Sequence, residues 1–207
     1  MKTHRLELFS DGVFAIVLTL LVLDLKLPSH LGVAGFLEVA PALMVHAATF
    51  GLVGYLWITH HNTVAMVKEV HPVSLALNVL ALFWLTLMPF TAKVAAANPM
   101  DSLGPSGIAA CLGLWTASTV VMRLTMHGPL DDVPEVRRWL DLRLRQYAAL
   151  AAVRLILAAL AWVSPWFGYA TFATVLVGLL FGPTPPLPAT LVNDSEGSSE
   201  PAELAAE

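Results

Sequence analysis

The chain contains very little cysteine and few charged residues. Cys111 is the single cysteine, so no internal disulfide can form and a cluster of thiolate metal ligands is excluded. Charged residues make up 13% of the sequence and hydrophobic residues 57%, and the mean hydropathy is +0.72. Soluble globular domains rarely have this composition. It predicts an integral membrane protein whose surroundings are the lipid bilayer, with no nucleic-acid partner.

The patterns of several other membrane protein classes are also missing. No His-x-x-x-His pair occurs, and the adjacent His60 and His61 would point about 100° apart on a helix, which is poor spacing for metal ligands. No convincing internal repeat of the kind found in secondary transporters is present. No nucleophile with a neighbouring base stands out within an apolar segment. A secondary transporter and a histidine-dependent intramembrane metalloenzyme remain as alternative functions.

Long apolar segments fill most of the chain. A bilayer core takes about 20 residues per helix, and six segments fit that length: residues 6–25, 35–59, 72–92, 105–126, 146–164 and 166–182. Ser164 and Pro165 separate the last two, which favours a tight helical hairpin over one broken helix. Pro41, Pro89 and Pro105 are expected to kink or start helices. The predicted fold class is an all-α integral membrane protein with six transmembrane helices per subunit.

The basic residues predict the orientation in the membrane. With the N-terminus inside, only Lys26 and Lys93 are outside and Arg154 lies within a helix. The remaining basic residues are cytoplasmic: Lys2, Arg5, Lys68, Arg123, Arg137, Arg138, Arg143 and Arg145. We therefore expect a multi-pass protein of the cell (inner) membrane with both termini in the cytoplasm.

Two segments differ from the apolar spans. Residues 127–145 are charged and form an inner linker that could include a short interfacial helix. Residues 183–207 are too poor in apolar and aromatic residues to fold, and are expected to be a disordered cytoplasmic tail. The transmembrane domain accordingly covers residues 1–182.

The first apolar segment begins with ionisable residues, although charge within hydrocarbon is costly. A helical projection places one set of residues in a single stripe: Arg5, Phe9, Gly12, Ile16, Thr19, Leu20, Leu23 and Leu27. Asp11, Ala15, Leu18 and Val22 fall on another side. Asp11 is expected to be buried against donors from neighbouring helices. On periodicity alone, a lipid-facing or core-facing helix would explain the aliphatic stripe.

A local motif resembles that of a known family. The sequence Arg5-x-x-x-Phe9-Ser10-Asp11, followed by Gly-Val-Phe-Ala-Ile, resembles the signature of the transmembrane protein 175 family of potassium channels. Weaker similar features are Trp57-Ile-Thr-His60-His61, Asn78 and Pro89-Phe90. The resemblance implies a homotetramer in which four copies of the first helix line a central pore. Potassium would be the permeant ion, and no cofactor is implied.

The resemblance also implies roles for the residues of the stripe. Ile16, Leu20 and Leu23 resemble the aliphatic pore constriction, and Thr19 resembles a threonine ring beside it. A run such as Thr-Val-Gly-Tyr-Gly is absent, so rings of backbone carbonyls cannot select the ion. Apolar collars stop ions by dewetting when narrow, and the Thr19 hydroxyls would favour potassium moderately over sodium. The predicted function is a cation channel with this selectivity, and not an enzyme.

The polar residues near the start of the helix have a separate predicted role. They are expected to form a structural brace that orients the first helix, composed of Arg5, Phe9, Ser10, Asp11, Trp57, His60, His61 and Asn78. Which of the two histidines joins the brace stays open. Arg154 is either a snorkelling residue or a buried partner for Glu38 or Asp24, and snorkelling is favoured.

Overall fold

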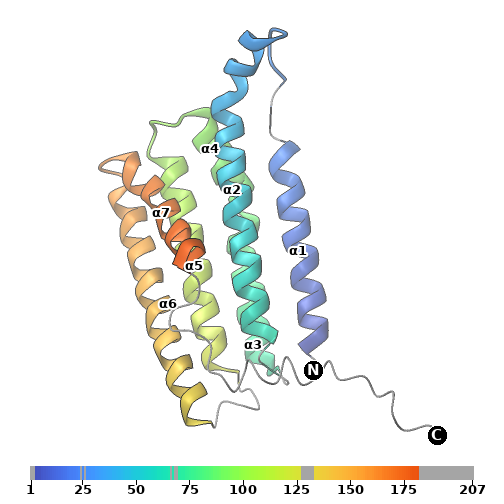
Figure 1. Ribbon diagram of the computed structural model, residues 1–207, viewed down its shortest axis with the longest axis vertical. Coiled ribbons are helices and arrows are strands. Elements are labelled where there is room, and N and C mark those ends of the chain that lie inside the picture. The colour runs from blue at the N-terminus through green and yellow to red at the C-terminus, as the bar shows by residue number, and fades with distance from the viewer. Residues whose placement is uncertain are drawn as a thin grey trace, which may run out of the picture.

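Seven helices run through the part of the chain that the computed structural model describes, residues 3–23, 25, 27–65, 67, 70–126 and 133–181. They are α1 (Thr3–Leu23), α2 (Val33–Ala65), α3 (Pro72–Thr86), α4 (Met88–Ala97), α5 (Leu103–Leu124), α6 (Pro134–Leu160) and α7 (Pro165–Phe181). The helices form an elongated bundle, with α1 at one edge and α6 at the other (Figure 1). The chain is all-α in this part, as predicted.

Four stretches are long and apolar enough to cross a membrane: His4–Leu23, Val33–Ala65, Pro72–Ala97 and Leu103–Leu124. They correspond to the first four predicted spans, which are thereby confirmed as helices of suitable length and composition. The fifth and sixth predicted spans correspond to the second half of α6 and to α7. Their role as membrane spans stays a prediction.

The connection between α6 and α7 is a tight turn. Helix α6 ends at Leu160, and Pro165 starts α7 after a short turn closed by backbone hydrogen bonds, such as that from Val163 N to Leu160 O at 2.9 Å. Proline suits the first turn of a helix because its missing N–H would have no partner there. The predicted hairpin at Ser164-Pro165 is therefore confirmed.

Helix α6 begins at Pro134, within the predicted inner linker 127–145, and continues without a break into the predicted fifth span. Its first half carries most of its charged residues. Residues 127–132 of that linker and the predicted tail 183–207 lie outside the described residues.

The third span consists of two helices in line. Helix α3 ends at Thr86, Leu87 adopts φ −82° and ψ −12°, and α4 starts at Met88. Pro89 follows directly, and its ring prevents the regular hydrogen bond to the preceding turn. The prediction that Pro89 starts or kinks a helix is confirmed.

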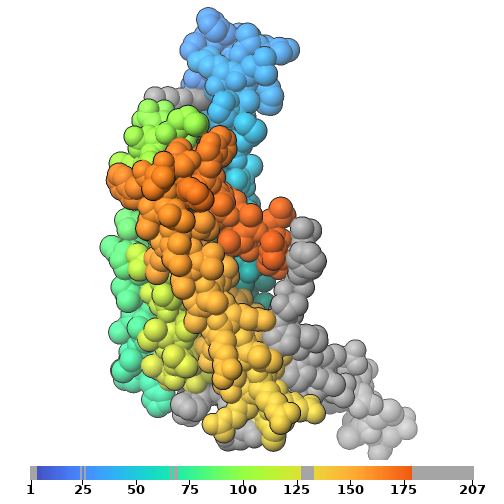
Figure 2. Space-filling model, turned by 90° about the vertical axis from the view of Figure 1, so that its left-hand side faces the viewer, coloured from blue at the N-terminus to red at the C-terminus, as the bar shows by residue number. Residues whose placement is uncertain are grey.

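The main apolar core lies between α1, α2, α3, α4 and α5, with α5 in the middle of the bundle. Trp115 and Leu112 of α5 are almost fully buried, as are Leu85 and Met88 on the other side of the core. Helix α6 covers α5 and forms an outer face of the molecule (Figure 2). This packing uses one side of α1 and leaves its other side uncovered.

Candidate functional site

One face of α1 packs into the bundle. Leu6, Ser10, Phe14, Val17 and Leu21 follow each other at helical spacing and are 5% exposed or less. They contact residues of two apolar clusters that include side chains of α2 and α3. Burial of this face fixes the rotation of α1 about its own axis.

The opposite face of α1 is open in the subunit. Phe9, Ile16, Leu20 and Leu23 are 55%, 60%, 43% and 75% exposed, respectively. Gly12 and Thr19 are exposed as well, and so is Leu27, which lies beyond the end of α1. The predicted stripe therefore lies on the uncovered side of the helix, which also includes Ala15 and Val22 from the side predicted to face other surroundings. A continuous apolar face of this kind requires lipid or another protein chain against it.

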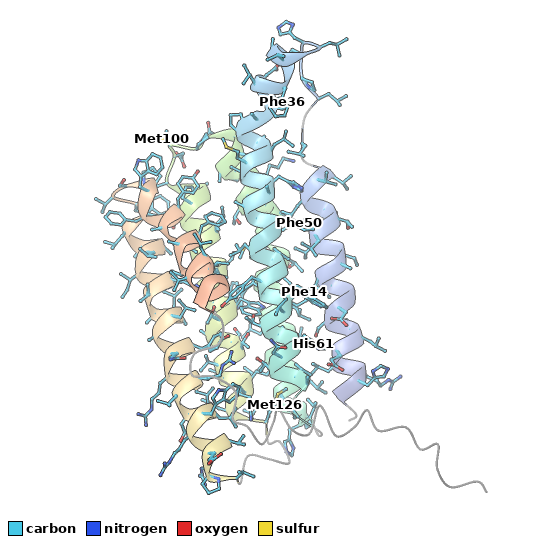
Figure 3. The ribbon with its side chains drawn as sticks, viewed as in Figure 1. Phe14, Phe36, Phe50, His61, Met100 and Met126 are labelled. Atoms are coloured by element: carbon cyan, nitrogen blue, oxygen red, sulfur yellow. The ribbon has the colours of Figure 1, made fainter. Side chains whose placement is uncertain are left out.

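Two acidic residues on a third side of α1 meet α2. The indole N–H of Trp57 donates a hydrogen bond of 2.8 Å to Asp11 Oδ1. One turn closer to the N-terminus, Glu7 Oε1 lies 3.6 Å from His61 Nδ1. The rings of Trp57 and His61 are stacked with their centroids 6.0 Å apart. These four side chains, here called the α1–α2 polar pairs, join the two helices near the end of the bundle where His61 lies (Figure 3).

A second polar contact joins α1 to α3. Asn78 Nδ2 donates a hydrogen bond of 3.1 Å to Ser10 Oγ, and Ser10 in turn donates to the carbonyl of Leu6 at 2.9 Å. Both side chains are buried. A buried amide would be costly without such a partner, so this contact fixes the position of α1 against α3.

His60 lies in the same region but makes a different contact. Its side chain is 2% exposed, and its ring lies 5.7 Å from the ring of Phe14, centroid to centroid. Neither ring nitrogen has a hydrogen-bond partner among the described residues. Of the two candidate histidines, His61 is therefore in the polar pairs, and His60 packs behind them.

Arg5 and Phe9 are placed apart from these contacts. Both are exposed on the open face of α1. The structure thus brings together Ser10 with Asn78 and Asp11 with Trp57, and leaves Arg5 and Phe9 of the predicted brace beside the uncovered stripe.

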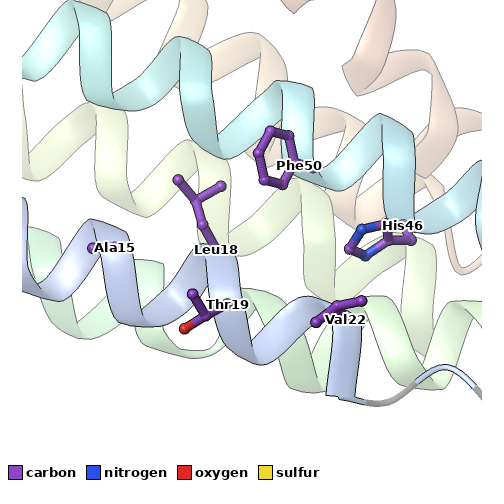
Figure 4. Close-up of a pocket in the computed structure, with 6 residues that line it drawn as sticks. All are labelled: Ala15, Leu18, Thr19, Val22, His46 and Phe50. Atoms are coloured by element: carbon purple, nitrogen blue, oxygen red, sulfur yellow. The ribbon is translucent and has the colours of Figure 1, made fainter.

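Beyond the polar pairs, α1 and α2 separate and leave an open groove. Ala15, Leu18, Thr19 and Val22 line it from α1, and His46 and Phe50 from α2 (Figure 4). The Thr19 hydroxyl donates to the Ile16 carbonyl at 2.8 Å, which leaves its lone pairs available at the groove and the open face. Apolar side chains dominate the remaining lining.

Glu7 and Phe14 were not among the predicted site residues, although a signal for Glu7 exists. Glu7 and Asp11 are four residues apart, as are Trp57 and His61, so each pair occupies one face of its helix. In antiparallel helices, two such pairs meet in register. The matched spacing of acids and aromatic donors could have identified Glu7.

The described residues contain no group of three or more His, Cys, Asp or Glu side chains that could hold a metal ion. His46, His60 and His61 all lie on α2 but share no acidic ligand set in this part of the chain. The contacts that α1 makes in the subunit are those of helix packing.

Known proteins are similar to this chain over the region that contains α1, α2 and α3. Residues 5–89 match the family model described as endosomal/lysosomal potassium channel TMEM175. A potassium channel from Chryseobacterium sp. (strain P1-3) is 34% identical over 128 residues, which cover 59% of this chain and 67% of that protein. The chain belongs to the TMEM175 family. TMEM175 proteins are ion channels, and this confirms that the protein is not an enzyme.

Vertebrate TMEM175 proteins are much longer than this chain. The mouse endosomal/lysosomal proton channel TMEM175 is 32% identical over 118 residues, which span half of this chain and 24% of the mouse protein. A crystal structure of a lysosomal potassium-selective channel TMEM175 homologue from Chamaesiphon minutus superposes with a TM-score of 0.71. It covers 86% of this chain and 96% of that one at 24% identity. The TMEM175 subunit fold therefore extends beyond the region of the family model.

Proposed function

We propose that the protein is a potassium channel with moderate selectivity over sodium, in which four identical subunits place α1 around a central pore. Ile16, Leu20 and Leu23 form its constriction, and Thr19 provides the selectivity ring. The relatives named as potassium channels support the permeant ion. No cofactor takes part.

The observation that carries this proposal is the uncovered stripe of α1. An isolated helix face exposed to lipid needs no particular residue order, whereas this one has large aliphatic side chains on successive turns with a single hydroxyl between them. Around a fourfold axis each residue becomes a ring of four. The aliphatic rings would then form consecutive collars along the pore.

Such collars control the passage of ions by whether or not they contain water. A narrow apolar collar loses its water and stops ions, and a modest dilation rewets it. The four Thr19 hydroxyls would orient water around a passing cation. Potassium releases part of its hydration shell more readily than sodium, so this ring favours potassium without the strict selection of a carbonyl filter.

The α1–α2 polar pairs and the Ser10–Asn78 contact have a supporting role in this proposal. They hold α1 at the rotation that directs its open face to the axis, and they do not touch the ion. We propose that the pairs lie at the cytoplasmic side of the inner membrane, because the basic residues of the chain concentrate at this end of the bundle.

Recording from the purified protein in planar bilayers tests this function. In a potassium gradient, unitary currents should reverse close to the potassium equilibrium potential, and replacement of potassium by sodium on one side should shift the reversal potential moderately. A secondary transporter would give no unitary currents and would require a coupled substrate. Currents that reverse at the chloride potential, or flux without unitary events, would contradict the proposal.

A further inference from the structure

Arg154 is a buried charge that the proposed pore does not use. It lies in the second half of α6, about two turns before the helix ends at Leu160. Its side chain is 1% exposed, so the snorkelling prediction is wrong. Glu38, one of the predicted acidic partners, instead accepts hydrogen bonds from Ser29.

The partners of Arg154 are neutral hydroxyls. Nη1 donates to Thr116 Oγ1 of α5 at 2.6 Å, and Nε donates to Thr174 Oγ1 of α7 at 3.1 Å. No salt bridge in the described part of the chain involves Arg154. A guanidinium taken out of water is costly unless an opposite charge compensates for it.

Two polar atoms beside this cluster are buried and have no hydrogen-bond partner within the described ranges. They are Nη2 of Arg154 and Oγ1 of Thr171. Thr171 is fully buried and lies one turn before Thr174, on the same face of α7. The guanidinium and this hydroxyl therefore offer two unused donors from two helices that pack against each other.

A second arginine, Arg143, lies about three turns before Arg154 on α6. Arg143 donates to the Tyr147 hydroxyl at 3.0 Å and lies over the Trp139 ring at 4.7 Å. The described contacts of both arginines are to hydroxyls and aromatic rings.

We propose that the junction of α5, α6 and α7 binds a small monovalent anion such as chloride, held by Arg154 Nη2 and the Thr171 hydroxyl. One negative charge balances the single charge of the Arg154 guanidinium. A small anion also suits this position, because Arg154 Nη2 and Thr171 Oγ1 are both buried.

The proposed anion is structural and does not depend on the pore function. Because it would bind the folded protein and not the unfolded chain, it should raise the midpoint of thermal unfolding as its concentration increases. The anion would join the two helices of the C-terminal hairpin to α5.

The test compares the full chain purified throughout in potassium chloride or in potassium gluconate at equal ionic strength. We expect chloride to raise the Tm of the wild type saturably, by about 3 °C. Arg154→Met should abolish this response, and Arg145→Gln, which alters an exposed arginine of the same helix, should retain it. Thr171→Val keeps the charge and should raise the half-saturating chloride concentration about fivefold.

Crystals or cryo-EM samples prepared in iodide or bromide provide a readout that does not depend on stability. A halide should appear within hydrogen-bond distance of Arg154 Nη2. Equal Tm values in the two salts, a chloride response that persists in Arg154→Met, or a water molecule alone at Nη2 in iodide would overturn the proposal.

Discussion

Asp11 and Ser10 are adjacent residues that form hydrogen bonds with two different neighbouring helices. Asp11 accepts from Trp57 on α2, and Ser10 accepts from Asn78 on α3. Each contact joins α1 to one side chain of the neighbouring helix. The orientation of α1 near its N-terminus therefore depends on a few individual groups, which mutation can remove one at a time.

Removal of the Asp11 carboxylate should weaken the assembly without changing ion preference. Asp11→Ala removes the acceptor of the Trp57 indole N–H, and because Trp57 is 40% exposed the cost is about 0.5–1.5 kcal/mol. We expect less oligomer and less total current, with an unchanged reversal potential. Size-exclusion chromatography and bilayer recording measure both quantities. The matched control is Glu7→Gln, which removes the charge of the longer 3.6 Å contact to His61 and should have a smaller effect.

The Thr19 hydroxyl should contribute to potassium selectivity. Thr19→Ala is expected to lower the potassium-to-sodium permeability ratio about threefold, since a hydrogen bond to water contributes about 0.5–1.5 kcal/mol. Thr86→Ala is a close control, because Thr86 on α3 is also exposed and its hydroxyl donates to the carbonyl three residues earlier, at 2.7 Å. Bi-ionic reversal potentials measure the ratio. Equal ratios in Thr19→Ala and the wild type would remove Thr19 from the selectivity mechanism.

At the scale of the helix, the collars proposed for α1 should act as a barrier to water. Ile16→Asn places an amide in one collar, which should rewet the constriction and raise the mean current severalfold. Ile156→Asn on α6 is the control, since Ile156 is 57% exposed and Ile16 is 60% exposed in the subunit. Single-channel recording separates open probability from conductance. A similar current increase in both variants would indicate a general loss of packing.

Close helix packing should make one glycine of α7 sensitive to substitution. A Cβ at Gly168 would lie 2.6 Å from backbone atoms of Pro105 on α5, so Gly168→Ala should destabilise the fold by about 1–3 kcal/mol. At Gly51 of α2 a Cβ would meet nothing within 4 Å, and Gly51→Ala should stabilise by about 0.5–1 kcal/mol. Thermal unfolding of the two variants should therefore shift in opposite directions.

The elements were easier to predict from sequence than their contacts. Apolar length and Pro165 were sufficient to place the helices and the α6–α7 hairpin, because bilayer thickness and proline chemistry act locally. The environment of Arg154 was predicted wrongly, since its partners Thr116 and Thr174 come from other helices. A hydroxyl partner leaves no charge pattern in the sequence, whereas a carboxylate would have done so.

For the candidate site too, the pattern along one helix was easier to predict than the contacts between helices. The stripe of α1 followed from helical periodicity, and its exposure in the subunit agrees with that pattern. The partners of Asp11 and Ser10 could be suggested only through family resemblance, because residues 46 and 68 positions away are involved. Which histidine meets the Glu7 carboxylate and which packs against Phe14 depends on the rotation of α2, which local sequence does not determine.

At the scale of the whole molecule, the open face of α1 should lie close to its copies. In a Cys111→Ala background, Leu23→Cys should form disulfide-linked dimers on mild oxidation, because four equivalent residues would surround one axis. Val163→Cys is the control, since Val163 is 81% exposed at the α6–α7 turn on the other side of the bundle. Non-reducing gels measure the cross-link, and native mass spectrometry should give four times the 22.2 kDa subunit mass. Equal cross-linking at both positions, or a monomer mass, would contradict the arrangement.

The attachment of α1 differs between its two ends, and this has a mechanical consequence. In the N-terminal half of α1, Asp11 and Ser10 make directional hydrogen bonds to neighbouring helices. In the C-terminal half, Val17 and Leu21 make only non-directional apolar contacts, which allow the helix to slide against its neighbours. A helix that is fixed near its N-terminus moves most at its C-terminal end when it tilts. A small tilt would thus displace Leu23 further than Ile16, and the proposed pore would widen more at Leu23 than at Ile16.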